Sequence, residues 1–391
     1  MSLLNKFNKN MSQIHPSPIR GFDEEASKVD GIIKLTLGEP DFHTPEHVKQ
    51  AAITAINHNV TTYAPTPGTL ELRQAAANFV KTKYGQEYDP QDEIIATVGA
   101  SESLSSALLA ILNPGDKVII PAPFFSMYQS IITIFGGIPV QLDTSSNDFV
   151  LSKEMLEEAL DKHGSDVKAV LLNYPTNPTG ITWTHKQAKE IADVLKNRDI
   201  FVISDEVYSE LVYDGEHVSI SEFLRPQTIV INGVSKSHAM TGWRLGLMFA
   251  PREIMAKLNV AHQQLVTTAT SITQAAATEA LKNGMNDAEE MRKEYRVRRD
   301  YVYERMTALG FNIVKPNGAF YIFAKIPKGF KQVSYDFCLD LARKGRVALI
   351  PGSAFCDGGE GYVRLSYAAS MDALVEAMNR LETYINDNKP K

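Results

Sequence analysis

The sequence predicts an α/β fold, in which a mostly parallel sheet carries helices on both faces and a smaller α+β domain completes the chain. Strand-like and helix-like segments alternate from about residue 93 to residue 231, as in chains that build a parallel sheet. Beyond about residue 250 this alternation ends. Helical segments and then strands with few helices follow, and they predict the second domain. Three strand segments are almost entirely apolar, which is typical of strands covered on both sides: 118–120, 170–172 and 201–203.

Two amphipathic helices precede the alternating region. The first begins at Thr44-Pro45, where proline suits the first helical position, and its spacing predicts that Val48, Ala52 and Ile56 face inward. The second runs from about Thr69 to Gly85. Its expected inward residues are Leu72, Ala76, Phe79 and Val80.

The remaining elements follow in chain order. The expected strands of the main sheet are 93–98, 117–120, 138–142, 167–172, 200–204 and 228–231, with helices at 101–112, from 126, at 152–160 and at 184–196. The second domain is expected to contain strands 320–325, 347–350 and 362–366, a helix at 334–344 and a final helix from 371. Because no Pro/Ser-rich linker separates the two parts, we expect a long charged helix around 287–305 to connect them.

Composition excludes several classes of protein. The 391 residues include 40 Lys and Arg against 46 Asp and Glu, so the net charge is −6 and no basic excess suggests a nucleic-acid partner. No apolar run approaches the ~18–20 residues of a membrane span, and the N-terminus lacks the apolar region of a secretory signal. Two cysteines cannot form a disulfide framework. We therefore expect a cytoplasmic protein with no membrane or nucleic-acid partner.

Several short strings resemble catalytic motifs without matching them. His43-Thr-Pro-Glu-His47 fits a zinc-binding string, but its prolines place it across a turn and a helix start instead of on one helix. Lys236-Ser237 lacks the glycine that a phosphate-binding loop needs before the lysine, and no G-x-G-x-x-G is present. The histidines show no metal-ligand spacing, so we expect no metal site.

Polar residues follow the predicted parallel strands at their carboxyl ends, where open α/β sheets bind ligands. Asn177 follows the strand that ends at about residue 172, and Asp205 and Tyr208 follow the next one. Lys236 comes after the strand at 228–231, and Arg244 stands eight residues later. The segment 98–102 joins a strand to a helix N-terminus, whose free amides suit a phosphate.

These segments together resemble the fold-type I pyridoxal-phosphate enzymes, specifically the class I and II aminotransferases. Segment 233–246 fits the class I lysine attachment pattern at every fixed position, and the resemblance extends from 17–20 and 38–41 to 362–366. It is closest to the bacterial acyl-diaminopimelate and aromatic amino acid aminotransferases. The resemblance implies an aspartate aminotransferase-like, seven-stranded large domain, pyridoxal 5′-phosphate as cofactor, and a homodimer with shared active sites.

The resemblance assigns the catalytic roles to three residues. Lys236 would form the Schiff base with the cofactor aldehyde and then move the proton during turnover. Asp205 would pair with the ring nitrogen and keep it protonated, so that the ring accepts electrons. Tyr208 would hydrogen-bond the phenolic oxygen of the ring together with Asn177.

The other cofactor and substrate contacts are implied in the same way. Arg244 would bind the phosphate, assisted by Ser235 and by the amides of the first turn of a helix, at Ala100, Ser101 and Glu102. Phe125, or its neighbour Phe124, would stack on the ring, and Tyr63 would reach the phosphate of the neighbouring subunit. Arg364 would hold the substrate α-carboxylate, with Asn177 and the backbone of Gly38 also at the substrate.

The predicted activity is transfer of an amino group from an L-amino acid, aromatic or similar to N-acetyl-diaminopimelate, to a 2-oxo acid such as 2-oxoglutarate by a ping-pong mechanism. The alternatives are a pyridoxal-phosphate-dependent C–S β-lyase on the same fold and a non-catalytic cofactor-binding regulator. Residues 48–285 are expected to form the cofactor domain. Residues 1–47 and 286–391 are expected to form a smaller domain that closes over the substrate.

Overall fold

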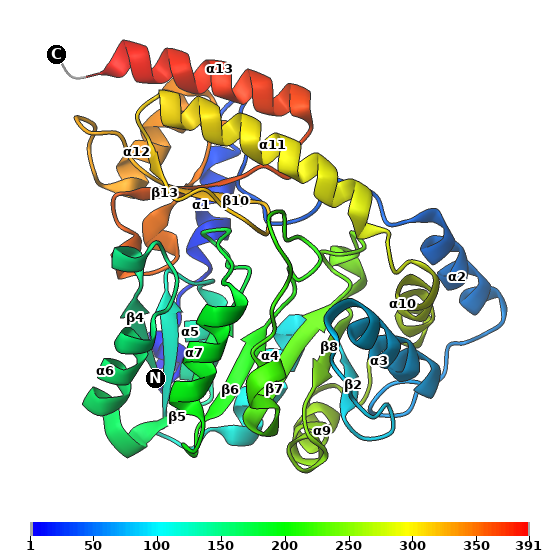
Figure 1. Cartoon of the computed structure of the whole chain (residues 1–391). Helices are drawn as coiled ribbons and strands as arrows, with labels where there is room; N and C mark the ends of the chain where they lie inside the picture. The colour runs from blue at the N-terminus through cyan, green and yellow to red at the C-terminus, as the bar shows by residue number, and fades with distance from the viewer. Residues whose placement is uncertain (1–2, 390–391) are drawn as a thin grey trace.

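The computed structural model describes residues 3–389, which form two layered units of sheet and helix (Figure 1). The larger sheet has seven strands in the order β2-β8-β7-β6-β5-β3-β4. Only β8 runs antiparallel to its neighbours, so the predicted mostly parallel α/β sheet is confirmed. The strands are β2 (Ile94–Thr97), β3 (Lys117–Ala122), β4 (Ile138–Asp143), β5 (Val167–Asn173), β6 (Phe201–Asp205), β7 (Thr228–Gly233) and β8 (Gly246–Phe249).

Helices cover both faces of this sheet because its strands are apolar on both sides. Val118 and Ile120 of β3 pack with one group of helices, whereas Ile119 between them packs on the opposite face. The first group is α4 (Ala100–Ile111), α5 (Met127–Ile134) and α9 (Arg252–Val266); the opposite face carries α6 (Lys153–His163) and α7 (His185–Leu195). The β2 edge is covered by α2 (Glu46–Asn57), α3 (Leu70–Tyr84) and α10 (Ser271–Asn283).

Local capping explains where the early helices begin and end. The Thr69 side chain accepts a hydrogen bond from the amide of Leu72, and Gly85 ends α3 with a φ of +68°. The predicted limits of this helix are therefore confirmed. One predicted inward residue of α2 is wrong: Ile56 is 51% exposed, and Ala55 takes the buried position. At 3.6 residues per turn, Ala55 lies about 20° from Val48 around the helix axis, whereas Ile56 lies about 80° from it.

The second sheet has four antiparallel strands in the order β12-β13-β10-β9, drawn above the large sheet in Figure 1. Its strands are β9 (Asn312–Ile313), β10 (Tyr321–Lys325), β12 (Ile350–Pro351) and β13 (Tyr362–Ser366). The single strand predicted at 347–350 is wrong in one respect. The chain changes partner inside it, so β11 (Val347–Ala348) leaves this sheet and pairs in parallel with β1 (Ile33–Lys34).

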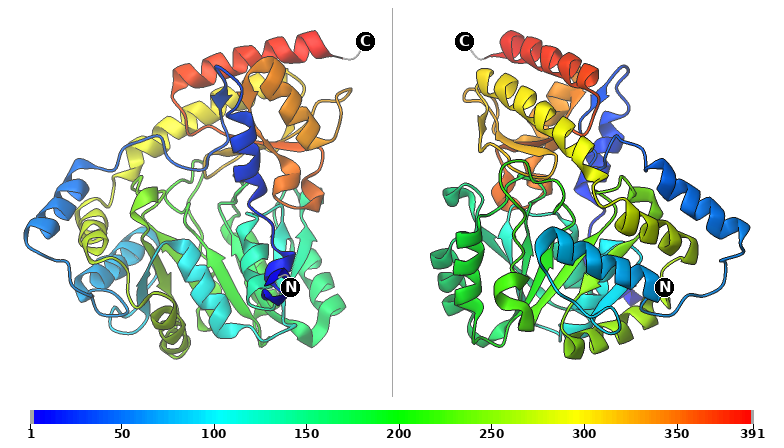
Figure 2. Two further views of the ribbon diagram at one scale, coloured as in Figure 1. Left: turned by 180° about the vertical axis from the view of Figure 1, so that it is seen from behind. Right: turned by 45° about the vertical axis from the view of Figure 1, so that its right-hand side comes forward.

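Helices from both ends of the chain surround the second sheet, as the two views of Figure 2 show. The long connection is α11 (Ala288–Ala308), beside which lie α12 (Ser334–Asp340), the π-helical turn Leu341–Gly345 and α13 (Met371–Asn388). From the N-terminal side, α1 (Pro18–Ala26) contributes Phe22, whose ring meets that of Tyr335 edge-on at 5.6 Å. Segments distant in sequence thus share one apolar core.

Short helical turns complete the described chain, and none of its helices combines the length and apolar character needed to cross a membrane. The turns are η1 (Leu3–Lys6), η2 (Met11–Gln13), η3 (Ser145–Asn147), η4 (Gly164–Asp166), α8 (Ser221–Leu224), η5 (Arg225–Gln227), η6 (Thr241–Trp243), η8 (Gly352–Ala354) and η9 (Asp357–Gly359).

Candidate active site

Three adjacent parallel strands deliver the central residues of the site. Asn173 at the end of β5 lies beside Asp205 at the end of β6, and Asp205 in turn lies beside Ile231 of β7. Lys236 follows the end of β7 by three residues. Because parallel strands end at the same edge of a sheet, these side chains come together at one edge once the sheet has formed.

Asp205 is a buried carboxylate held by several donors. Its side chain accepts a hydrogen bond from the Tyr128 hydroxyl at 2.7 Å and from the Val207 amide at 3.3 Å. The Asn173 amide group donates to the Asp205 carbonyl oxygen at 2.9 Å. Burial raises the pKa of Asp205 to about 6, although the bond from Tyr128 opposes this shift. The carboxylate is therefore fixed in position and suited to accept a hydrogen bond from a cation.

Lys236 directs its amine toward the N-terminal segment of the chain. The Nζ atom donates a hydrogen bond to the Gly38 carbonyl oxygen at 2.6 Å and lies 5.9 Å from the centre of the Tyr208 ring. Burial lowers the pKa of Lys236 to about 8, and the positive charges of Arg244 and Arg364 act in the same direction. A substantial part of this amine is thus unprotonated near pH 8, as a nucleophile or general base requires.

Two phenols connect this lysine to the small sheet. The Tyr208 and Tyr321 hydroxyls form a hydrogen bond of 2.8 Å, and both side chains are buried. Burial raises the pKa of Tyr208 well above its ordinary value, so the phenol stays protonated and can donate. Gly38 passes directly against Tyr321, because a Cβ atom at position 38 would lie 2.2 Å from the Tyr321 hydroxyl oxygen. A glycine is needed there for the backbone to approach.

Arg364 lies in the middle of β13 with only 2% of its surface exposed. Its Nη1 donates to Asn177 Oδ1 at 3.0 Å, and its Nη2 donates to the Thr36 carbonyl oxygen. The guanidinium stacks between the rings of Tyr321 and Phe355, at 4.6 and 4.8 Å from their centres. Within residues 3–389 its Nε finds no acceptor. This buried donor and the fixed plane of the guanidinium suit a carboxylate ligand.

The N-terminus of α4 forms a second possible anion site with Arg244. Gly99 precedes the helix with a φ of +77°, and a Cβ atom there would lie 2.6 Å from an Arg244 guanidinium nitrogen. The amides of Ala100 and Ser101 find no acceptor in the described chain, so they can bind an anion. The Glu102 amide differs from the prediction, because it donates to the Gly99 carbonyl oxygen at 3.0 Å.

The side chain of Glu102 has a structural task instead. Its carboxylate accepts hydrogen bonds from the Val98 amide at 3.1 Å and from the Ser106 hydroxyl, and His262 Nδ1 lies 3.2 Å away. Because both Glu102 and His262 are buried, these contacts fasten the first turn of α4 to α9. The turn that would face a phosphate is thereby rigid.

The remaining predicted residues lie in different surroundings. Phe124 is buried in the core, whereas Phe125 is partly exposed and packs edge-on against Tyr128 at 5.8 Å. Ser235 is half-buried beside Lys236. Tyr63 is 88% exposed and is not brought to the other predicted residues within this chain. Its predicted role concerns a neighbouring subunit.

Sequence reasoning missed four residues that organise the site: Thr36, Tyr128, Asn173 and Tyr321. Asn173 could have been found, because it directly follows the strand predicted at 167–172, just as Asp205 directly follows the strand predicted at 200–204. Tyr128 could not be related to the site, since nothing in the sequence places helix α5 beside Asp205. The string 43–47 does not lie on one helix, since α2 begins at Glu46, and its His47 contacts Glu279 and Asp287 at 2.8 and 2.9 Å.

The family model for aminotransferase class I and II matches residues 30–381 of this chain. The chain belongs to the class I and II aminotransferases. It is 50% identical over 378 residues to a probable N-acetyl-LL-diaminopimelate aminotransferase of Bacillus subtilis, covering 97% of this chain and 95% of the relative. It is 40% identical to the aromatic-amino-acid aminotransferase 2 of Thermococcus litoralis, with 97% and 98% of the two chains covered.

Solved structures of aminotransferases share the fold. An aromatic aminotransferase from Pyrococcus horikoshii superposes with a TM-score of 0.88 at 40% identity, over 94% of this chain and 99% of that one. The aspartate aminotransferase of Thermus thermophilus with maleate gives a TM-score of 0.91 at 35% identity, over 96% and 99%. The protein is thus a fold-type I enzyme that transfers amino groups, as the sequence predicts.

Proposed function

We propose that this aminotransferase uses pyridoxal 5′-phosphate and carries an amino group from an L-amino acid similar to N-acetyl-LL-diaminopimelate to 2-oxoglutarate by a ping-pong mechanism. The observation that carries the proposal is the convergence of three charged groups: the Lys236 amine, the buried Asp205 carboxylate and the buried Arg364 guanidinium. The relative at 50% identity supports the substrate, and the other relatives support the reaction class.

The residues at the site fit the cofactor. The close packing of Gly99 under Arg244, beside the free amides of Ala100 and Ser101, suits the phosphate. Asp205 suits the ring nitrogen because its buried carboxylate favours a cationic partner, and Tyr208 and Asn177 suit the phenolic oxygen. When bound, the cofactor supplies a ring that stores the electron pair released at the substrate Cα.

The residues of this chain would then divide the work as follows. Lys236 would hold the cofactor, and its amine, with a pKa lowered to about 8, would take up and return the Cα proton of the substrate. Arg364 binds the substrate α-carboxylate through parallel N–H donors and so fixes the Cα–H bond toward Lys236. Gly38 offers its carbonyl oxygen beside the same amine.

The proposal includes a domain arrangement and an assembly. Residues 48–285 form the cofactor domain, and residues 1–47 together with 286–391 close over the substrate, which is supported by the pairing of β1 with β11. Tyr63, exposed on its own chain, reaches the cofactor phosphate of a second copy in a homodimer. A cytoplasmic location is part of the proposal, supported by the unpaired cysteines.

A screen of amino donors with 2-oxoglutarate tests this function. We expect N-acetyl-LL-diaminopimelate to give the highest kcat/KM, with phenylalanine, tyrosine and aspartate below it, and Lys236→Ala to give no turnover above background. A higher kcat/KM for an aromatic donor or aspartate would overturn the substrate assignment. Release of pyruvate and thiol from cystathionine without any oxo acid would overturn the transferase mechanism in favour of a lyase.

A further inference from the structure

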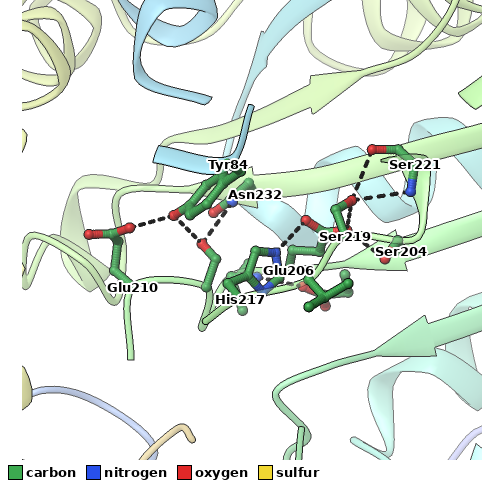
Figure 3. A network of polar contacts seen from close by, with 12 residues as sticks. Tyr84, Ser204, Glu206, Glu210, His217, Ser219, Ser221 and Asn232 are labelled. Carbon is green, nitrogen blue, oxygen red and sulfur yellow. Dashed lines mark hydrogen bonds and ion pairs between the residues drawn. The ribbon is translucent and has the colours of Figure 1, made fainter. Parts of the chain in front are cut away.

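The buried polar network of Figure 3 includes Glu206 and Glu210, which belong to the same turn as Asp205 and Tyr208. This turn, residues 205–210, presents two kinds of side chain to opposite sides. Asp205 and Tyr208 face the candidate active site, where they bond to Tyr128 and Tyr321. Glu206, Ser209 and Glu210 face away from it and are 2–5% exposed. The network therefore touches the site through the backbone of one short turn.

Glu206 is the centre of one half of this network. Its Oε1 accepts hydrogen bonds from the Ser204 hydroxyl at 2.8 Å and the Ser219 hydroxyl at 2.6 Å, and its Oε2 lies 2.8 Å from His217 Nε2. The Glu206 amide also donates to the Ile231 carbonyl oxygen at 2.8 Å. Three donors converge on one side chain, so Glu206 is present as a carboxylate.

The hydrogen-bond pattern also defines the state of His217. Its Nδ1 is buried and finds no partner in the described chain. A proton on that nitrogen would be a buried donor without an acceptor, so the ring is neutral and its proton lies on Nε2, which donates to Glu206. The histidine holds Glu206 but does not neutralise it. Within residues 3–389 no lysine or arginine forms an ion pair with this carboxylate either.

The second buried glutamate of the network provides a contrast. Glu210 accepts a hydrogen bond from the Tyr84 hydroxyl at 2.6 Å, and Lys83 Nζ lies 3.1 Å from its other oxygen. The charge of Glu210 is thus compensated by a cation, whereas the charge of Glu206 is not. Glu206 is also the residue adjacent to Asp205, so its uncompensated charge acts on the carboxylate of the active site.

We propose that Glu206 is a positioning residue for amino-group transfer: its hydrogen bonds fix the turn of Asp205 and Tyr208, and its negative charge retains the proton on the cofactor nitrogen that Asp205 faces. This rests on the proposed cofactor. A negative charge behind Asp205 stabilises a proton that lies between Asp205 and the cofactor nitrogen. In agreement with this, the charge of Glu206 contributes to raising the pKa of Asp205.

The other charged or titratable groups near these two carboxylates are few. Asp205 is faced by Tyr128, Lys236 and Tyr208. Glu206 is faced by His217 and by the phenols of Tyr84 and Tyr88, whose pKa values burial raises so that both stay neutral at ordinary pH. Among the groups behind the turn, Glu206 is thus the one whose replacement changes the charge that acts on Asp205.

The test measures protonation of the cofactor nitrogen directly, by the ¹⁵N chemical shift of ring-labelled pyridoxal phosphate bound to the protein across a pH series. In Glu206→Gln we expect the nitrogen to lose its proton about one pH unit lower than in the wild type. The matched control is Glu210→Gln, the same isosteric change in the same network, for which we expect a shift of less than a third of that size.

A second pair of variants tests the contact between His217 and Glu206 without replacing Glu206 itself. His217→Gln keeps a donor toward Glu206 and should titrate like the wild type. His217→Leu removes that donor, which disfavours the charged form of the buried Glu206 carboxyl, and should therefore shift in the direction of Glu206→Gln. If Glu206→Gln does not fold, as judged by circular dichroism, this pair carries the test alone. Equal midpoints for the wild type, Glu206→Gln and His217→Leu would overturn the inference. Failure of the wild type to bind the cofactor would instead overturn the proposed function.

Discussion

The two ends of the candidate site hold charge in opposite ways. At the buried end, Arg364 and Asp205 are 2% and 8% exposed and are fixed by side-chain hydrogen bonds. At the other end, Arg244 is exposed, and its recorded hydrogen bond runs to the nearby Thr241 carbonyl oxygen at 3.0 Å. A buried charged group binds its ligand mainly through the fixed geometry of its hydrogen bonds. An exposed charged group binds mainly through electrostatic attraction, which solvent screens.

The largest expected effect follows from replacing the buried guanidinium. Arg364→Lys keeps the charge but loses the planar donors and the stacking between Tyr321 and Phe355. We expect KM for the amino donor to rise on the order of 100-fold, with a smaller change in kcat, measured by steady-state kinetics with 2-oxoglutarate saturating. An unchanged KM would show that Arg364 does not bind the substrate carboxylate. It would also contradict the contrast between the two ends of the site.

The next effect concerns stability in the absence of cofactor. Burial raises the pKa of Asp205 to about 6, above its unfolded value of about 4, so its ionisation opposes folding as pH rises through 6. Asp205→Asn should therefore raise the free energy of unfolding of the cofactor-free protein by about 2 kcal/mol at pH 8. Urea unfolding at several pH values measures this, and the gain should vanish near pH 4. A gain that persists at pH 4 would contradict the assignment of the effect to ionisation.

The smallest effect is expected at the exposed end. Arg244→Lys preserves a positive charge near the Gly99 turn. A phosphate binds a lysine ammonium, which acts as a point charge, more readily than does a carboxylate that is held by two parallel donors. We expect the dissociation constant of the cofactor to rise by about tenfold or less, and to rise further with added salt. Fluorescence titration with pyridoxal phosphate at two ionic strengths measures both. A loss as large as that of Arg364→Lys would contradict the contrast between the buried and exposed ends of the site.

Features that depend on local chemistry could be predicted from the sequence. The limits of α3 follow from a threonine cap and a terminal glycine, and the polar residues at the ends of β5 and β6 follow from the common edge of parallel strands. The mostly parallel sheet follows from the alternation of apolar strands and helices. In each case the signal lies within a few residues or in a repeated pattern.

Features that depend on packing between distant segments could not be predicted. The bond from Tyr128 to Asp205 requires α5 to cross the end of β6, and nothing near Tyr128 in sequence encodes that position. The same holds for Tyr321, which reaches Tyr208 only when the small sheet is in place. The prediction for Glu102 concerned only its amide, and nothing near Glu102 in sequence indicates that its carboxylate contacts His262 from α9.

The N-terminal segment that crosses to the small sheet has a consequence for the order of synthesis. The Leu35 carbonyl oxygen accepts a hydrogen bond from the Ser366 amide, so two partners about 330 residues apart must meet. At 5–20 residues per second the ribosome needs on the order of half a minute to deliver the second after the first. Strands β2 to β8 emerge within that interval and can pair. The edge that would receive the cofactor is therefore made early, while the arginine that would select the substrate arrives last.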